Sequence, residues 1–473
     1  MSRATIIGGS IAGLLTAAAL ADSFDEVVIV ESDQLPARPG FRRGVPQGNQ
    51  VHALLAIGVL AMERLLPGVT DELRRAGGVD LDAGCEVAIY EAEGWAGRVR
   101  SDAWVISMRR THLEYVLRER VLGLPGITLR PGEVVGLLAA GDRVTGVALH
   151  GDPKISTEIG TEIGTEIGAD LVIDASGRGS RAPAWLEELG YQRPREQELR
   201  SYVGYATVPV RLPDGVFPDG VPAILSHPNP TNHYGSSVIP VGNGLHLFGA
   251  LGMMKCYPPT EHDAFMAHLG KASSPLVAEL AKVAEFAGEI SGYRMPGTRR
   301  RLWEKLVRRP AGFAVIGDAV MSINPLYGQG MSVAAVEALA VQATARAGGG
   351  ESELAERIQQ AIVPVVERVF QLVVGIDSRY PEAKLIGIER LPEEMLALAK
   401  ALSELATEDA EASRAFRYAV HFFANEEMAT ESLLGKALRR LNSGHSPACH
   451  DPNHIPGILG TAAPLTRDWL ALL

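Results

Sequence analysis

The first thirty residues constrain the fold of this chain more than any other stretch. An apolar strand, predicted over residues 4–7, runs directly into a glycine-rich turn, and a helix rich in alanine and leucine follows. A second apolar strand, over residues 27–30, ends at Glu31. A strand, a tight turn, a helix and a second strand that ends in an acidic residue form the unit that holds the adenosine half of a dinucleotide. The sequence therefore predicts a Rossmann-like nucleotide-binding domain.

The turn has the spacing of a Gly-x-Gly-x-x-Gly fingerprint, with serine at its middle position. Gly8 allows the tight turn, Ser10 stands where backbone must approach a pyrophosphate, and Gly13 lets the helix pack closely on the strand. Free N–H groups at the helix N-terminus attract phosphate, and Glu31 would accept hydrogen bonds from ribose hydroxyls. A plain βαβ unit with a glycine-rich bend is the alternative, and the turn alone does not distinguish FAD from NAD. The turn residues predicted to contact the cofactor are Gly8, Gly9, Ser10, Ala12 and Gly13.

The composition argues against several classes of protein. A net charge of −11 over 473 residues argues against a general nucleic-acid binder, because neutralising phosphates needs a basic surface. Three widely spaced cysteines cannot form a disulfide framework, and the first apolar run is neither a signal peptide nor a membrane span. We therefore expect a cytoplasmic protein, a monomer or homodimer. No metal is predicted, because a paired Cys-x-x-Cys is missing from the one suggestive cluster, His445, Cys449, His450 and His454.

Two later motifs place an acidic residue at the end of a predicted strand. An apolar strand over residues 169–174 ends in Asp174 and a glycine turn, and another ends at Gly317–Asp318. A loop with proline and glycines and a long helix rich in alanine and valine follow the second motif. A carboxylate in that place can hold the hydroxyls of a ribityl chain, and N–H groups after Gly330 can face the pyrimidine oxygen of a flavin. The three motifs in this order indicate FAD.

With these motifs, the sequence resembles the class A FAD-dependent monooxygenases, the para-hydroxybenzoate hydroxylase class. It is most similar to actinobacterial epoxidases of polyketide chains in the runs 42–52, 174–180 and 317–332, and the resemblance covers roughly residues 3–345. The resemblance implies that FAD is the cofactor. By position, the implied FAD contacts beyond the glycine turn are Glu31, Arg42, Arg43, Arg110, Asp174, Gly317, Asp318, Pro325, Gly328, Gly330 and Met331.

The resemblance also implies an α/β fold with a discontinuous, Rossmann-like FAD-binding domain and a substrate domain built on an antiparallel sheet. Short β-rich runs broken by glycine, asparagine and proline support the sheet. A helical C-terminal region, expected from its helical spacing of apolar residues, would pack across the substrate cavity. The predicted bounds are 1–75, 105–185 and 295–345 for the FAD-binding domain, 76–104 and 186–294 for the sheet domain, and 346–473 for the helical region.

Aromatic and methionine side chains of the sheet region would give an apolar, adaptable substrate pocket. Packing inside the sheet would explain any one of them equally well. The predicted pocket residues are Trp95, Tyr205, Tyr234, Phe248 and Met253.

The resemblance implies epoxidation or hydroxylation of a hydrophobic, polyketide-type intermediate through a flavin hydroperoxide. NADPH or NADH would be the reductant and would dock transiently, since a second glycine fingerprint is missing. Such an enzyme positions its substrate in a dry pocket, so no catalytic acid–base pair is assigned. The alternative is a non-redox, FAD-containing Diels–Alder cyclase that forms a dialkyldecalin from a polyene polyketide. Leu245 and His246, where the epoxidases usually carry tryptophan, keep that alternative open.

Overall fold

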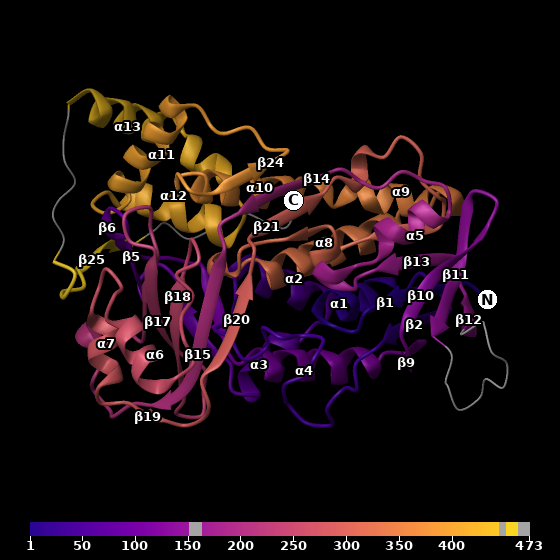
Figure 1. Cartoon of the computed structure of the whole chain (residues 1–473), viewed down its shortest axis with the longest axis horizontal. Helices are drawn as coiled ribbons and strands as arrows, with labels where there is room; N and C mark the ends of the chain where they lie inside the picture. The colour runs from indigo at the N-terminus through magenta and orange to yellow at the C-terminus, as the bar shows by residue number, and fades with distance from the viewer. Residues whose placement is uncertain (151–162, 444–450, 462–473) are drawn as a thin grey trace.

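A parallel sheet forms one half of the molecule. The computed structural model describes residues 1–150, 163–443 and 451–461 (Figure 1). All neighbouring strands of this five-stranded sheet run parallel, in the order β22-β13-β1-β2-β9. Its strands are β1 (Arg3–Ile7), β2 (Glu26–Glu31), β9 (Ile127–Pro131), β13 (Leu171–Asp174) and β22 (Phe313–Val315). Helices α1 (Ile11–Leu20), α4 (Arg110–Leu122) and α8 (Gly330–Arg346) pack beside it, and α1 contacts both of the others.

An eight-stranded sheet forms the other half. Its order is β19-β15-β18-β17-β16-β5-β6, with β20 paired to β15. All of these pairs are antiparallel except that of β16 with β5. Two short helices, α6 (His262–Leu269) and α7 (Leu276–Ala281), pack on this sheet. Its strands are β5 (Val87–Glu91), β6 (Gly94–Trp95), β15 (Val203–Arg211), β16 (Ala223–Ser226), β17 (Tyr234–Pro240), β18 (His246–Gly252), β19 (Glu285–Phe286) and β20 (Ser291–Met295).

The C-terminal region is mainly helical and lies along the top of both halves in Figure 1. The region also contains two strands that pair with earlier parts of the chain. Strand β24 (Lys384–Ile386) pairs with β14 (Glu196–Arg200), and β25 (Ile458–Thr461) pairs with β7 (Arg98–Arg100). These strands tie the region to earlier parts of the chain. The helices are α9 (Glu351–Ala361), α10 (Val363–Asp377), α11 (Glu393–Leu405), α12 (Ala410–His421) and α13 (Glu431–Ser443).

One helical stretch, Ser352–Asp377, is long and apolar enough to cross a membrane by length and composition alone. Half of its most apolar window is buried inside the protein. The stretch comprises most of α9 and all of α10; both helices pack on α8, and α9 also packs on β22. This burial is what a core helix of a globular domain would show.

The remaining elements belong to smaller sheets or connect the strands. The remaining helices are α2 (Ala56–Leu65), α3 (Val69–Arg75) and α5 (Ala182–Glu188). The remaining strands are β3 (Ala53–Leu54), β4 (Val79–Asp82), β8 (Trp104–Ser107), β10 (Val134–Ala140), β11 (Arg143–His150), β12 (Ile163–Gly168), β21 (Thr298–Arg301) and β23 (Met321–Ser322).

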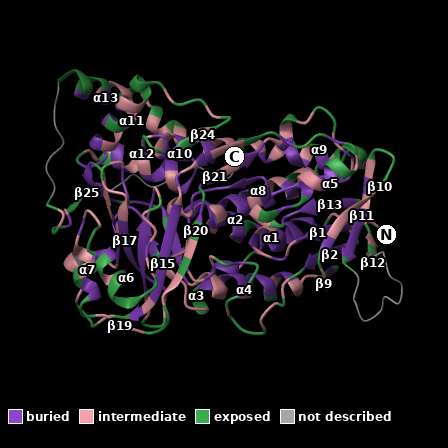
Figure 2. Ribbon diagram, viewed as in Figure 1, coloured by how far each residue is buried: buried purple, intermediate pink, exposed green. Residues whose placement is uncertain are grey.

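The predicted fold class is confirmed: a parallel α/β unit, a largely antiparallel sheet and a helical C-terminal region are all present. Figure 2 shows that the strands of both sheets are largely buried. One apolar core spans the parallel sheet and its helices, and a second lies between the eight-stranded sheet and α6–α7. The strands of the parallel sheet fall inside the three predicted segments of the FAD-binding domain, whose bounds stay a prediction.

Candidate functional site

A cavity of about 790 Å³ is lined by residues from both sheets and from the C-terminal helices. It opens at the carboxyl ends of the parallel strands, where Ile7, Glu31, Ala175 and Gly317 line it. Ligands of parallel α/β sheets bind at this edge, because the loops and helix N-termini there face a common space. The cavity is therefore the candidate functional site.

The glycine turn after β1 requires glycine at two positions. Gly8 has φ +103°, and a Cβ on it would lie 2.7 Å from the carbonyl oxygen of Ala175. A Cβ on Gly13 would lie 1.9 Å from the carbonyl oxygen of Gly8. The turn can therefore pass close to β13 while α1 packs directly on it, as the fingerprint predicts.

The serine in the fingerprint joins a polar network under the turn. Ser10 Oγ accepts a hydrogen bond from Arg110 Nη2 at 3.1 Å and lies 3.1 Å from Glu114 Oε2, to which it donates. Glu114 Oε1 in turn accepts from Arg42 Nε at 2.5 Å. A glycine at position 10 would lack both contacts, so the serine supports the two arginines that border the cavity.

Arg42 is the centre of a buried ionic cluster. Besides Glu114, its Nη1 lies 3.3 Å from Glu31 and 3.2 Å from Asp33. Burial lowers the pKa of Arg42, but the charges of Glu114 and Glu31 outweigh it and hold that pKa above its ordinary value. Glu31 also accepts a hydrogen bond from the N–H of Gly9 at 2.8 Å. The cluster fixes the end of β2 against the glycine turn.

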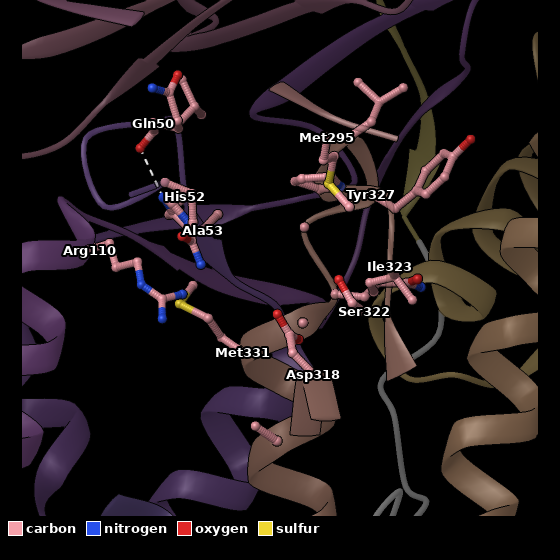
Figure 3. A pocket seen from close by; sticks show the side chains of 18 of the residues that line it. Gln50, His52, Ala53, Arg110, Met295, Asp318, Ser322, Ile323, Tyr327 and Met331 are labelled. Carbon is pink, nitrogen blue, oxygen red and sulfur yellow. Dashed lines mark hydrogen bonds between the residues drawn. The ribbon is translucent and has the colours of Figure 1, made fainter. Parts of the chain in front are cut away.

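Arg110 and Asp318 come from different elements and approach the same space (Figure 3). Arg110 begins α4, and Asp318 lies in the turn after β22; both line the cavity. Burial lowers the pKa of Arg110 and raises that of Asp318, and each charge opposes the shift of the other. Arg110 Nε has no hydrogen-bond partner among the described residues, nor is any donor to the Asp318 carboxylate recorded there. Arg110 Nη2 is occupied by Ser10 and lies 3.8 Å from Glu114, so the groups left available to a ligand are its Nε and the Asp318 carboxylate.

The loop from Pro325 to Met331 forms another wall of the cavity. Asn324 precedes it and accepts hydrogen bonds from Leu326 N at 3.0 Å and from Tyr205 Oη at 3.1 Å. Asp377, at the end of α10, accepts from Asn324 Nδ2 at 3.2 Å and from the Tyr327 hydroxyl. Sequence reasoning missed Asp377, the last residue of α10.

Four residues predicted to contact the cofactor do not line the cavity: Gly9, Gly13, Arg43 and Asp174. Arg43 is exposed to solvent, unlike its neighbour Arg42. Asp174 is fully buried, and its carboxylate accepts from Ser176 N at 2.9 Å and Ser180 Oγ at 2.5 Å. It shapes the turn that brings residues 175–179 to the cavity, so its place in the site is indirect. The other predicted contacts line the cavity, namely Gly8, Ser10, Ala12, Glu31, Arg42, Arg110, Gly317, Asp318, Pro325, Gly328, Gly330 and Met331.

Of the five predicted pocket residues, Tyr205 lines the cavity, whereas Trp95, Tyr234, Phe248 and Met253 do not. Side chains alternate between the faces of a strand, and on β17 Ser237 and Ile239 face the cavity while Tyr234 does not. Leu251 likewise takes the cavity face of β18. Of the others, Phe248 and Trp95 are fully buried in the core of the eight-stranded sheet, Met253 in the larger core, and Tyr234 packs edge-on against His268.

The structure adds residues that sequence reasoning did not assign to the site. Gln50 and His52 line the cavity, and His52 Nδ1 lies 2.9 Å from the carbonyl oxygen of Gln50 (Figure 3). Burial lowers the pKa of His52 to about 3, so its ring is neutral at physiological pH. At the end of the cavity formed by β5, β16 and the C-terminal helices lie further polar side chains: Glu91, Glu93, His227, Arg379, Arg417 and His421.

No metal site was predicted near the C-terminus, and His445, Cys449 and His450 lie outside the described residues. Within residues 1–150, 163–443 and 451–461, no group of three or more His, Cys, Asp or Glu side chains could hold a metal ion.

Glu337 gives a pH-dependent prediction. This fully buried α8 carboxyl accepts a hydrogen bond from Gly317 N at 2.6 Å, yet burial raises its pKa to about 8. The folded state keeps a proton that the unfolded chain loses near pH 4.5, so stability falls as pH rises from about 4.5 to 8. Glu337→Gln, whose amide does not titrate, should remove this loss, which amounts to about 3 kcal/mol by pH 7. The denaturant midpoints of the native protein and of Glu337→Gln should therefore be closest at pH 5. Their difference should grow as the pH rises to 8, with the variant becoming the more stable relative to the native protein. Glu353→Gln is the control, because Glu353 is exposed. If the midpoints of Glu337→Gln and of the native protein changed with pH in the same way, the prediction would be contradicted.

Comparison with known proteins places the chain in a family. No protein-family model matches the sequence. The chain is 30% identical over 351 residues to protein Rv3254 of Mycobacterium tuberculosis, a match that covers 71% of either chain. This chain belongs to the same family as Rv3254. The 351 matched residues are more than the parallel-sheet unit contains, so the similarity extends beyond the nucleotide-binding motifs.

Solved structures show which fold this family member has. PqsL of Pseudomonas aeruginosa, a probable FAD-dependent monooxygenase, superposes with a TM-score of 0.60 at 17% identity, over 80% of this chain and 97% of PqsL. The Diels–Alderase PyrE3, from the biosynthetic pathway of pyrroindomycins, superposes with a TM-score of 0.58 at 16% identity, over 94% of this chain and 80% of PyrE3. The fold is therefore that of the class A FAD-dependent monooxygenases, which confirms the predicted resemblance.

Proposed function

We propose that this chain binds FAD along the cavity. The residues present fit that cofactor: Gly8 and Gly13 allow the tight turn and the close packing of α1, which bring Ser10 and Ala12, at the N-terminus of α1, to the cavity wall where a pyrophosphate would lie. Arg110 offers a buried, unpartnered Nε to the pyrophosphate or ribityl chain, and the Asp318 carboxylate would accept hydrogen bonds from ribityl hydroxyls. The loop from Pro325 to Met331 would flank the isoalloxazine ring.

The reaction we propose is monooxygenation of a small hydrophobic molecule of polyketide type. FAD, reduced by NADPH or NADH, supplies the oxygen-transfer chemistry when bound. The observation that carries this proposal is the continuity of the cavity, which joins the carboxyl ends of the parallel strands to a chamber with apolar walls. Leu225, Ile239 and Leu251 provide those walls from the eight-stranded sheet and would exclude water while the substrate is held. We place the enzyme in the cytoplasm, as a monomer or homodimer.

A second candidate is a non-redox, FAD-containing cyclase. The C-terminal helices line the chamber, and the superposition on the Diels–Alderase PyrE3 covers 94% of this chain. A chamber that folds a polyene for cycloaddition needs shape and dryness, and the same walls would provide both.

Two measurements on the purified protein test these proposals. The protein should be yellow and release one FAD per chain; colourless protein that takes up no flavin when soaked in FAD would overturn both candidates. Anaerobic mixing with NADPH or NADH should then bleach the flavin of a monooxygenase. Flavin that neither nucleotide reduces, with or without a linear polyene carboxylic acid present, would move the assignment to the cyclase. Mass spectrometry of an aerobic product separates them as well, because oxygenation adds one oxygen atom and cyclisation leaves the mass unchanged.

Asp318→Ala should weaken FAD retention by about 1–3 kcal/mol, because a buried carboxylate would no longer accept hydrogen bonds from the cofactor. The measurement is the FAD dissociation constant from fluorescence titration of the apoprotein. Asp263→Ala is the matched control, since that side chain is 93% exposed and lies on α6. Equal FAD affinity of Asp318→Ala and the control would show that Asp318 does not bind the cofactor.

A further inference from the structure

The chamber end of the cavity contains charged groups that FAD binding does not explain. It is bordered by β5, β16, β17 and the helices α10 to α12. Most of its walls are apolar, including Ile89, Leu225, Ile239, Phe416 and Val420. An apolar chamber has no need of charged side chains for packing, and each one placed there loses hydration. The partners of those charges therefore indicate what the chamber is built to hold.

All but one of these charged side chains have a protein partner. Glu93 forms an ion pair with Arg379, and Glu91 Oε1 lies 2.9 Å from His227 Nδ1. Asp82, buried nearby, accepts hydrogen bonds from Ser101 N at 2.9 Å and Ser101 Oγ at 2.7 Å. These acids are engaged by groups other than Arg417.

Arg417 is the exception. It lies on α12 with 2% of its surface exposed, and it lines the cavity. Its Nε and Nη2 have no hydrogen-bond partner, and no carboxylate lies within 4 Å, among the residues that the structure describes. Burial lowers the pKa of Arg417 to about 10, and the more distant charges of Glu91 and Asp82 only partly oppose that shift. The guanidinium therefore stays charged at neutral pH without an ion pair.

A buried guanidinium without an acceptor costs several kcal/mol, which an anion bound from outside would offset. Two further nitrogen atoms of residues that line the cavity also lack a partner among the described residues: His421 Nδ1, one helical turn after Arg417, and His227 Nε2. Burial lowers the pKa of His421 to about 3, so that ring is neutral and can donate one hydrogen bond without adding charge. Arginine recognises a carboxylate with two parallel hydrogen bonds.

We propose that Arg417 binds a carboxylate of the substrate, and that the substrate is an apolar chain with this acidic group at one end. This inference rests on the proposed function in taking the chamber as the substrate site. Anchoring the acidic end among α12 and β5 would direct the apolar chain along the cavity toward the loop from Pro325 to Met331. Arg417 would thus set which part of the chain reaches the reacting end of the cavity.

The test is equilibrium binding to the purified holoprotein of decanoate and of decanamide, a neutral molecule of the same shape. Isothermal titration calorimetry at pH 7.5 should show decanoate binding at least about tenfold more tightly than decanamide. Arg417→Met should remove that preference and leave decanamide affinity within about threefold. Arg417→Lys should retain part of it, because lysine keeps the charge but lacks the bidentate geometry.

Arg414→Met is the matched control, since Arg414 lies one turn earlier on α12, is half-buried and does not line the cavity. It should leave both affinities unchanged. Equal affinity of the native protein for the two probes would overturn the proposal even if Arg417→Met failed to fold. A preference that survives Arg417→Met would overturn it as well, by assigning the anion to another cation. Because binding is measured without turnover, a protein whose flavin is never reduced can still show the carboxylate preference, so the two proposals fail separately.

Discussion

Gly13→Ala should prevent the strand–turn–helix unit from folding normally, with a loss of more than about 3 kcal/mol of stability. The new Cβ would lie 1.9 Å from the carbonyl oxygen of Gly8 and 3.4 Å from Ile6 Cγ2. Backbone on one side and a buried strand on the other leave no side chain whose movement could relieve the contact. Thermal unfolding and the yield of flavin-bound protein are the measurements, and both should fall sharply.

Gly375→Ala is the control for this substitution. Gly375 also lies inside a helix, α10, but an added Cβ there would meet nothing within 4 Å. Because alanine has the higher helix propensity, this variant should gain about 0.5–1 kcal/mol. If Gly13→Ala were as stable as Gly375→Ala, the inference that α1 packs too closely on the glycine turn to admit a Cβ at position 13 would be contradicted.

Sequence reasoning succeeded where a short motif fixes its own geometry. The strand, turn and helix around Gly8 are contiguous, so their spacing already indicated a tight glycine turn and the close approach of the helix. The same holds for Asp318 and the loop that follows it, which lie at a strand end that parallel topology directs to the ligand edge.

It failed where the site depends on which face of an element meets the cavity. Residue type alone indicated Phe248 and Trp95 as pocket residues, yet strand alternation and the cover of α6 and α7 place them in a core. Arg417 was missed for the opposite reason: its helix joins the cavity because the C-terminal region packs on β7, which no local pattern encodes. Which residues line the chamber therefore depends on tertiary packing, whereas the residues at the nucleotide end of the cavity can be identified from local motifs.

Arg42→Met should cost about 3–5 kcal/mol, because it leaves three acidic side chains without their shared cation. Arg42 is buried, and its guanidinium contacts Glu31, Asp33 and Glu114, two of which are themselves buried. Thermal and denaturant unfolding at pH 7.5 measure this loss.

The adjacent Arg43→Met provides the matched comparison, since Arg43 is exposed and should change stability by less than about 0.5 kcal/mol. Adding Glu114→Gln to Arg42→Met removes one of the unpaired charges while an amide oxygen can still accept from Ser10. The double variant should therefore recover part of the stability that Arg42→Met loses. Equal stability losses at positions 42 and 43, or a double variant less stable than Arg42→Met alone, would show that the three carboxylates do not depend on Arg42.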